Sequence, residues 1–336
     1  MGQQISRTAL VLAALLLSTA RVVVGADAQG TTTLLPPQPP TITAAVVSIV
    51  IDDLGDRRAE GLRAIELPGS VTYAILPHTA HGATLARLAH SLDKEIIVHV
   101  PMEAVSDRAL GPGGLTAALS QQQFKQRLLS AIASVPHAQG VSNHMGSRLT
   151  AMPRQMQWLM DILRMRHDWM FLDSRTTSNT VALSIARGAG LRATFRDVFL
   201  DNEVNVSAIR ARFREFIAKA RMHGSAVAIG HPYAETLQVL AEELPRLSVH
   251  RASHTSGRPN AIHAAVRARA KRTRQNNPAL EIELVPLSRL IAARASVLNP
   301  GQARRRPTNK HLPRQAASSI TVHPQPSWVE NHPDHR

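Results

Sequence analysis

The stretch VVSIVIDDLG, residues 46–55, contains the pattern that decides the fold. A mostly β-branched apolar run leads directly into two adjacent carboxylates, Asp52 and Asp53, which are followed by Leu54 and Gly55. Such a run, bounded by a turn signal, is typical of a buried β-strand. Adjacent residues on a strand point to opposite faces, so the two carboxylates need not have the same role. Asp also begins turns and caps helices, and this segment alone is compatible with that simpler interpretation.

Similar strand-like runs recur along the chain and alternate with segments of helical periodicity. Repeated β-then-α units predict a parallel sheet, and seven or eight such units favour a closed barrel over an open sheet. We expect strands at 46–51, 71–76, 95–100, 140–143, 169–172, 192–195, 225–230 and 281–286. We expect helices at 57–66, 80–92, 120–134, 153–166, 178–188, 205–222 and 234–244.

The composition limits the chemistry of the protein. The chain has 336 residues, of which 44% are apolar, so it is long enough for a substantial core. It contains no cysteine, which excludes disulfides, cysteine nucleophiles and iron–sulfur clusters. Any metal site must use His, Asp, Glu or water, and these ligands suit Zn²⁺ or another divalent ion.

The N-terminus has the pattern of an export signal. Arg7 precedes an apolar run at 8–20, and Ala26-Asp27-Ala28 gives a small-residue cleavage pattern, so we predict a cleaved signal peptide at 1–28. The apolar run is short for a membrane span, and Arg21 interrupts it. We therefore expect an exported, periplasmic protein with no transmembrane span in the mature chain.

The rest of the chain divides into a balanced body and a basic extension. Residues 251–336 contain 15 Lys and Arg but only 4 Asp and Glu, which accounts for +11 of the net charge of +15. We predict a Pro- and Thr-rich linker, a barrel domain, a basic insert within it and a disordered basic tail, at 29–44, 45–295, about 248–279 and 296–336 respectively.

The basic insert includes AIHAAVRARAKRTR, residues 261–274, which could form a short helix with Arg and Lys on most faces. One interpretation is that insert and tail attach the protein to an anionic envelope surface, such as a polymer or lipid head groups. No aromatic residues interleave the basic run, so we expect no nucleic-acid partner. The alternative is that the insert is a solvated loop in an Arg-rich protein.

Active sites of parallel barrels lie at the C-terminal ends of the strands. Several polar residues fall at these ends of the predicted strands. Each alone is a weak signal, because a single His at a strand end often has only a structural role. Together they place acids and imidazoles at one end of the predicted barrel: Asp52, Asp53, His99, Asn143, His144, Asp173, Ser174, Arg175 and His231.

One carboxylate and two imidazoles form a set of metal ligands that leaves positions open for water and substrate. Asp53, His99 and His144 fit this description. They come from three different strand ends, which the barrel topology brings together. We therefore predict a divalent metal, most simply Zn²⁺, held by these three side chains.

Other residues of the same group fit the proton transfers of a hydrolysis. Asp52, beside the predicted ligand Asp53, could take a proton from a metal-bound water, whose acidity the metal raises. His231 could donate a proton to a departing amine or alcohol. Asp173 could orient an imidazole by a hydrogen bond. The set predicts metal-assisted hydrolysis of an amide or ester.

The segments around these residues resemble the motif series of the divergent polysaccharide deacetylase family. The resemblance covers residues 46–250, followed by IELVPLSRL, expected as a strand at 282–290, and it is carried by IDDLG, HVPME, NHMGS, FLDSRT, RDVFLDN and IGHPYAET. It implies an α/β fold, a distorted (β/α) barrel with about seven parallel strands. It also implies metal-dependent removal of acetyl groups from sugars, usually with Zn²⁺.

The resemblance transfers three roles to this sequence: Asp52 as base, Asp53 as metal ligand and His231 as proton donor. The wider superfamily places both metal histidines in one short motif, four residues apart. Here the corresponding loop reads PHTAHG, with His78 and His81 three apart. These two residues remain an alternative to the histidine pair of HVPME and NHMGS.

Four further residues have less defined roles. Glu103 is either an additional ligand or a loop anchor. Asn143, Ser147 and Arg175 would line the cleft and contact substrate, or else form turns and surface ion pairs.

Three functions remain open at this point. The first is a deacetylase acting on a carbohydrate polymer or oligosaccharide of the cell envelope. The second is a non-catalytic periplasmic glycan-binding or scaffolding protein that keeps the barrel. The third is a hydrolase of another acyl ester at the same site.

Overall fold

The computed structural model describes residues 44–249 and 281–298. The predicted signal peptide lies outside these ranges, as do residues 29–43 of the linker, 250–279 of the basic insert and 299–336 of the tail. Within the described residues, no helix has the length and apolar character needed to cross a membrane.

All strand pairs of the described sheet are parallel, and six strands follow one another in the order β6-β5-β4-β3-β2-β1. The other edge of β1 pairs with β8, and β8 pairs with β7. All eight predicted strands are confirmed, and β7 and β9 were not predicted. The strands are β1 Ala44–Leu54, β2 Thr72–Ile75, β3 Glu95–Met102, β4 Gly140–Met145, β5 Met170–Asp173, β6 Arg192–Phe195, β7 Val198–Phe199, β8 Ser225–Gly230, β9 Ser248–Val249 and β10 Glu281–Leu284.

One short segment closes the sheet into a barrel. β6 pairs with β5 at one edge, and β7, two residues later, pairs with β8 at the other edge. The change of partner falls between Arg196, whose N–H donates to Asp173 O at 3.0 Å, and Asp197, whose N–H donates to Val227 O at 2.8 Å. Counting the β6–β7 segment once gives a barrel of seven parallel strands, as expected.

The final strand is shorter than predicted, and a helix follows it. β10 ends at Leu284, and α9 occupies Leu287–Leu298, so the expectation of a strand over 282–290 was wrong beyond residue 284. Pro286 supplies the break, because proline cannot continue the ladder of hydrogen bonds and is well suited to a helix start. β10 pairs with only the first four residues of β1, Ala44–Val47.

Helix α9 closes the N-terminal end of the barrel. Leu287, Leu290 and Ile291 form one apolar cluster with the strand residues Val50, Ala74, Ile97, Met170, Leu172, Val227 and Ile229. The N-terminal end is therefore sealed by packing, and chemistry is left to the C-terminal ends of the strands.

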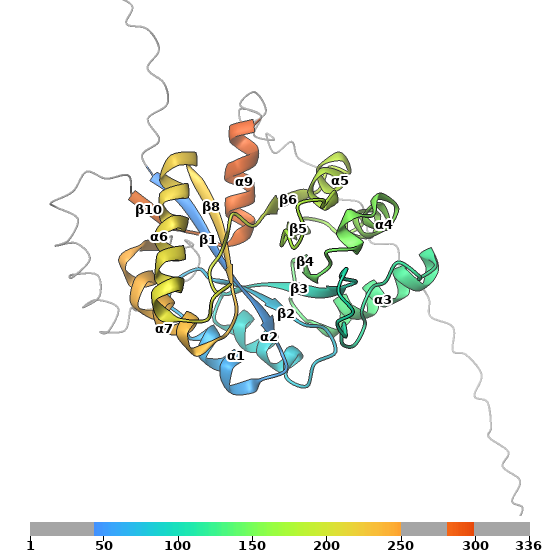
Figure 1. The fold of residues 1–336 in the computed structure, drawn as a ribbon, viewed down its shortest axis with the longest axis horizontal. Coiled ribbons are helices and arrows are strands. Elements are labelled where there is room, and N and C mark those ends of the chain that lie inside the picture. Colours follow the sequence, from blue (N-terminus) through green and yellow to red (C-terminus); the bar gives the residue numbers. More distant parts are fainter. Residues whose placement is uncertain (1–43, 250–280, 299–336) are drawn as a thin grey trace, which may run out of the picture. The chain divides into compact units, whose positions relative to one another are not determined.

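The remaining helices lie around the strands (Figure 1). Their apolar faces and the outward faces of the strands form a second, larger core cluster, which explains why β1 is buried along most of its length. All seven predicted helices are confirmed. They are α1 Arg58–Ile65, α2 Gly82–Ser91, α3 Gln121–Ser134, α4 Pro153–Leu163, α5 Ala182–Gly188, α6 Val206–His223 and α7 Ala234–Glu243, with 3₁₀ turns at Leu149–Ala151 and Leu244–Arg246.

Candidate metal centre

The end of β1 departs from regular strand geometry at the paired carboxylates. Asp53 has a φ of 59°, in the left-handed region, and the register with β2 shifts by one residue between Ile51 and Leu54. Such a bulge re-aims side chains, which on a regular strand would point to opposite faces. As a result, Asp52 Oδ2 and Asp53 Oδ1 lie 3.4 and 3.2 Å from the same atom, His99 Nε2.

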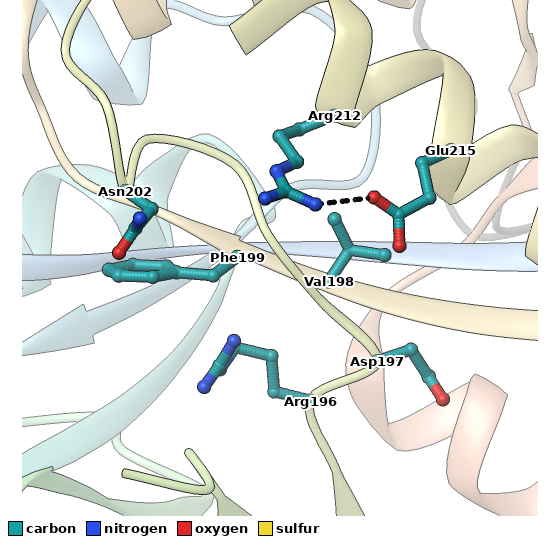
Figure 2. A pocket seen from close by; sticks show the side chains of 7 residues that line it. All are labelled: Arg196, Asp197, Val198, Phe199, Asn202, Arg212 and Glu215. Carbon is teal, nitrogen blue, oxygen red and sulfur yellow. Dashed lines mark hydrogen bonds and ion pairs between the residues drawn. The ribbon is translucent and has the colours of Figure 1, made fainter. Parts of the chain in front are cut away.

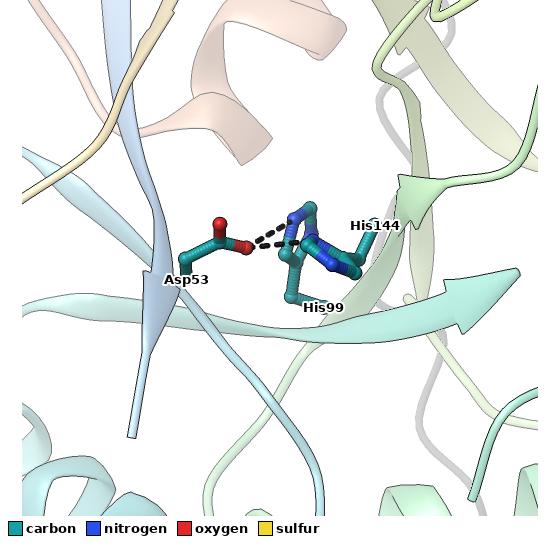
Figure 3. Close-up of side chains that lie close together, drawn as sticks. All are labelled: Asp53, His99 and His144. Carbon is teal, nitrogen blue, oxygen red and sulfur yellow. Dashed lines mark ion pairs between the residues drawn. The ribbon is translucent and has the colours of Figure 1, made fainter. Parts of the chain in front are cut away.

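Side chains from three strands meet at the site, where two imidazoles approach one carboxylate oxygen of Asp53 (Figure 3). His99 of β3 and His144 of β4 place their Nε2 and Nδ1 atoms 3.2 and 2.8 Å from Asp53 Oδ1. One ligand atom from each residue lies within 4.8 Å of the others, so the group could hold a metal ion. His99 is fully buried, whereas Asp53 and His144 are partly exposed, so the group is open on one side.

Neighbouring groups orient the two imidazoles. His99 Nδ1 lies 2.7 Å from Ser142 Oγ, and a proton on Nδ1 leaves the Nε2 lone pair facing Asp53. His144 is followed by Met145, whose φ is 52°. The Met145 carbonyl accepts hydrogen bonds from Asn143 Nδ2 at 2.7 Å and from Thr176 Oγ1 at 2.9 Å. These bonds hold the irregular strand end that carries His144.

Two carboxylate oxygens at the site are left without hydrogen-bond donors. Asp52 Oδ1 and Asp53 Oδ1 are buried and have no hydrogen-bond partner, and the contacts of Asp53 Oδ1 with the two imidazole nitrogens are ion pairs. Buried acceptors in this state are costly unless another group satisfies them. One oxygen and two imidazole nitrogens around a common point are a donor set that suits Zn²⁺. The residues therefore fit a divalent metal.

His231, which follows β8, lies at the other side of the carboxylate pair. Its Nε2 is 3.7 Å from Asp53 Oδ2, and its Nδ1 is 3.0 Å from Asp201 Oδ1. Asp201 is buried, and its Oδ2 accepts hydrogen bonds from the His231 N–H at 2.5 Å and from Thr236 Oγ1 at 2.8 Å. The ring therefore has one nitrogen tied to Asp201 and the other facing the candidate metal centre.

The pKa values of these groups are strongly coupled. Burial raises the pKa of Asp52, although His99 and His231 partly offset this effect. Burial also opposes ionisation of Asp53, but the adjacent imidazoles of His144 and His99 outweigh it and lower that pKa. For His231, burial favours the neutral ring, yet the contact with Asp201 prevails and raises the pKa to about 9. Strongly shifted pKa values in one cluster are typical of functional sites.

The other predicted site residues are placed as follows. Asp173 was expected to orient an imidazole, but its oxygens accept hydrogen bonds from Arg175 N and Thr180 Oγ1, both at 2.9 Å. The His231 imidazole is instead held by Asp201. Asn143 is buried and accepts from Ser174 N at 2.9 Å, so it joins the ends of β4 and β5. The Arg175 side chain lies over the Phe195 ring, 4.2 Å from its centroid.

Two loop residues connect the segment after β3 to the segment after β4. Ser147 Oγ accepts from Val105 N at 2.9 Å. Glu103 pairs with Arg148 at 2.8 Å and accepts from Ala117 N at 2.5 Å, which fits its alternative interpretation as a loop anchor.

The alternative histidine pair lies outside the cluster. His78 contacts Ser130 and Ser134 of α3, with Nε2 3.4 Å from Ser130 Oγ and N–H donating to Ser134 Oγ at 3.1 Å. His81 begins α2. Among the described residues, neither belongs to the group of potential metal ligands.

Two residues of the site were missed from the sequence. Asp201 follows β7, so the rule of polar residues at strand ends would have found it if β7 had been predicted. Ser142 precedes Asn143 in β4 and gave no signal of its own, since its role depends on the register that places it opposite His99.

Comparisons with known proteins identify a family and relatives that this chain is similar to. The family model described as divergent polysaccharide deacetylase matches residues 49–253. YibQ of Escherichia coli (strain K12), described as uncharacterized, is 37% identical over 201 residues, which cover 60% of this chain and 63% of YibQ. An uncharacterized protein of Haemophilus influenzae is 38% identical over 201 residues, covering 60% of this chain and 71% of that protein. This chain thus spans less than two thirds of the length of YibQ.

A solved structure shares the fold. The uncharacterized protein ATU2773 from Agrobacterium tumefaciens C58 superposes with a TM-score of 0.60 at 23% identity. The superposition covers 74% of this chain and 89% of that protein.

Proposed function

The chain belongs to the divergent polysaccharide deacetylase family, and from that premise we propose that it is a metal-dependent hydrolase that removes acetyl groups from an envelope or extracellular glycan. The observation that carries this proposal is the convergence of Asp53, His99 and His144 within 4.8 Å of one another. In the proposed enzyme, these three side chains hold Zn²⁺. The metal would acidify a water molecule and polarise the acetyl carbonyl.

Asp52 is the proposed base. Its Oδ1 is a buried oxygen without a hydrogen-bond donor, so it is free to accept a proton from the attacking water. Its other oxygen contacts His99, a proposed ligand, at 3.4 Å, which keeps the carboxylate beside the metal centre. Burial raises its pKa, and a carboxylate with a raised pKa is a stronger proton acceptor.

His231 is the proposed acid. Its Nδ1 is tied to Asp201, so Nε2 is the nitrogen that can donate a proton to the departing amine or alcohol of the sugar. Its pKa of about 9 favours the protonated ring at neutral pH. The base and the acid thus lie next to different members of the proposed ligand set. Asp52 contacts His99, and His231 contacts Asp53 Oδ2.

The remaining predictions complete the proposal. We propose that Ser147 and Arg175 contact the glycan at the rim, and that Asn143 and Asp173 support the strand ends below them. We place the activity in the periplasm because of the signal-peptide pattern at 1–28. Attachment to an anionic envelope surface through the basic insert and tail remains a prediction about residues outside the described ranges.

Metal analysis and acetate release together test the function. The mature chain, loaded with Zn²⁺, is incubated with peptidoglycan fragments, chitin oligosaccharides and O-acetylated xylan, and released acetate is measured. We expect one metal per chain and acetate from at least one glycan. His99→Ala and His144→Ala should both lose metal and activity, whereas His78→Ala, the matched control, should retain both.

Three results would contradict the proposal in different ways. Loss of metal from His78→Ala with full retention in the other two variants would show that the ligands are wrong. Retained metal without acetate release from any glycan would favour the non-catalytic glycan-binding protein, and release of another acyl group alone would favour the third alternative.

A further inference from the structure

A cavity of about 320 Å³ lies beside the segment that closes the barrel (Figure 2). One side of the cavity is formed by the segment 196–202, which connects β6 to α6 and includes β7. The other side is formed by α6. The lining residues are Arg196, Asp197, Val198, Phe199, Asn202, Arg212 and Glu215. None of them is a proposed metal ligand, base or acid.

The cavity adjoins the proposed proton donor. The guanidinium of Arg196 lies 4.9 Å from the centroid of the Phe199 ring. The same ring meets His231 edge to face, with centroids 5.4 Å apart. A single aromatic ring thus separates the Arg196 guanidinium from the imidazole that would act on the substrate. Phe199 thus lines the cavity and also contacts the proposed proton donor.

Arg196 is a partly buried cation without a direct counter-ion. It donates only to main-chain carbonyls, from Nε to Ser174 O at 2.7 Å and from Nη2 to Arg175 O at 2.9 Å. In the part of the chain that the structure describes, no carboxylate lies within ion-pair distance of it. Burial lowers its pKa, and the more distant negative charges of Asp52, Asp173 and Asp197 only partly offset this effect. A cation taken from water without a paired charge favours an anionic ligand.

Both acids that line the cavity already have cationic partners. Asp197 pairs with Arg294 of α9 at 2.5 Å. Glu215 pairs with Arg212 at 2.8 Å and with Lys219 at 3.3 Å. The negative charges of the cavity are therefore compensated by direct ion pairs. The positive charge of Arg196 has no such direct pair among the described residues, so Arg196 is the group of the lining that favours an anion.

We propose that this cavity is the binding subsite for a carboxylate-bearing sugar that adjoins the sugar to be deacetylated. A guanidinium binds a carboxylate through two parallel N–H donors, which suits Arg196, and the opposite wall carries the Arg212–Glu215 ion pair. The Phe199 ring offers an apolar surface for a sugar face, and the amide of Asn202 can bind hydroxyls. The inference deepens the proposed function: the substrate is an acidic, N-acetylated glycan.

A pair of matched oligosaccharides tests the subsite. The probes are the hyaluronan tetrasaccharide, which alternates N-acetylglucosamine with glucuronate, and the same tetrasaccharide with its carboxylates reduced to alcohols. Affinities are measured by calorimetry with the zinc-loaded full chain, in an Asp52→Asn background that prevents turnover. We expect the acidic probe to bind about tenfold more tightly than the neutral one, as for one charge-assisted carboxylate contact.

Variants of the lining locate this preference. Arg196→Gln should abolish it, and Arg212→Gln should reduce it about threefold. Should Arg196→Gln not fold, the exposed helix residue Arg212 carries the test. Glu215→Gln removes a negative charge from the lining and should increase the preference. Arg214→Gln is the matched control, because it removes an exposed Arg from α6 that does not line the cavity, and it should change nothing.

Three outcomes would overturn the inference. They are equal binding of the two probes, an effect of Arg214→Gln as large as that of Arg196→Gln, and loss of the preference when zinc is removed, which would place the carboxylate on the metal. The proposed function is tested separately by acetate release. Acetate release from neutral oligosaccharides without any acidic preference would leave the deacetylase intact and contradict the subsite. The acidic preference without acetate release would do the reverse.

Discussion

Both carboxylate oxygens of Asp201 contact His231: Oδ2 accepts a hydrogen bond from its backbone N–H at 2.5 Å, and Oδ1 lies 3.0 Å from its Nδ1. The first contact fixes the chain at the end of β8, and the second fixes the orientation of the ring. Because Nδ1 is engaged, the nitrogen that faces Asp53 is Nε2, at 3.7 Å from Oδ2. Asp201 is thus a positioning residue for the proposed acid.

Replacing Asp201 with Asn tests this relationship. The change keeps the size of the side chain but removes the charge that raises the pKa of His231 to about 9 against the effect of burial. The pKa of His231 should fall, so the protonated fraction at neutral pH decreases and the basic limb of the kcat profile moves to lower pH. We expect kcat at pH 8 to fall about 100-fold.

Thr236→Val is the matched control for Asp201→Asn. Thr236 Oγ1 also donates to Asp201 Oδ2, at 2.8 Å, but its loss leaves the carboxylate charge in place. The pH profile should therefore keep its shape. An Asp201→Asn profile that superposes on that of the wild type would contradict the positioning role.

The regular parts of the fold were predictable from the sequence because local patterns determine them. The run at 46–51 is apolar and β-branched, and the parallel sheet around it buries both of its faces. The short strand β7 was not predictable, because its two residues, Val198 and Phe199, are too few to show the alternation of apolar and polar residues that marks a strand. Its existence depends on the edge of β8 that the closing barrel brings to it, which is a tertiary effect.

The candidate site shows the same division. Topology predicted that Asp53, His99 and His144 would share one end of the barrel, since polar residues at strand ends meet there. It could not predict that Asp52 and Asp53 would face the same histidine, because that depends on a bulge and a left-handed residue. Asp173 ends β5 and Asp201 follows β7, and only their three-dimensional contacts show that Asp201 is the one that contacts a histidine.

Ser142→Ala tests the support of the proposed ligand His99. Ser142 Oγ is the partner of His99 Nδ1 at 2.7 Å, and its loss releases the ring that presents Nε2 to the metal. We expect Zn²⁺ affinity, measured by competition with a chelator, to fall about 10- to 100-fold. Ser48→Ala is the control, because Ser48 is also buried on a strand but its Oγ has no hydrogen-bond partner. Equal losses in the two variants would contradict the specific role of Ser142.

Arg294→Gln tests how α9 is fastened to the barrel. Arg294 donates to Asp197 Oδ2 at 2.5 Å, to Thr194 Oγ1 at 2.6 Å and to Ser225 Oγ at 3.0 Å. The side chains of Arg294 and Asp197 are only 16% and 17% exposed, so removal of the cation leaves a poorly solvated carboxylate. We expect the free energy of unfolding to fall by about 2 kcal/mol, measured by urea denaturation.

The control for Arg294 is Arg164→Gln. Arg164 also pairs with an acid, Asp161 at 3.2 Å, but its side chain is 60% exposed. Exposed ion pairs contribute little, so the change should stay within about 0.5 kcal/mol. If both variants unfold at the same urea concentration as the wild type, the contacts of Arg294 do not fasten the helix.

Glu95→Gln tests the pH dependence that the closed end of the barrel imposes on stability. Glu95 begins β3 and is buried, and its carboxylate accepts hydrogen bonds from Thr72 Oγ1 at 2.9 Å and from Ser288 N at 3.2 Å. Burial raises its pKa above the ordinary value of 4.5, and these bonds only partly offset that effect. The folded state therefore binds the proton more tightly than the unfolded state. The contribution of the protonated Glu95 to stability is fully present below pH 4.5 and is lost as the pH rises through the folded pKa.

Gln keeps an acceptor for both donors but cannot ionise, so the melting temperature of Glu95→Gln relative to the wild type should rise between pH 4 and pH 8. A difference that stays constant over this range, measured by circular dichroism at fixed ionic strength, would show that Glu95 does not titrate between the folded and unfolded states as argued.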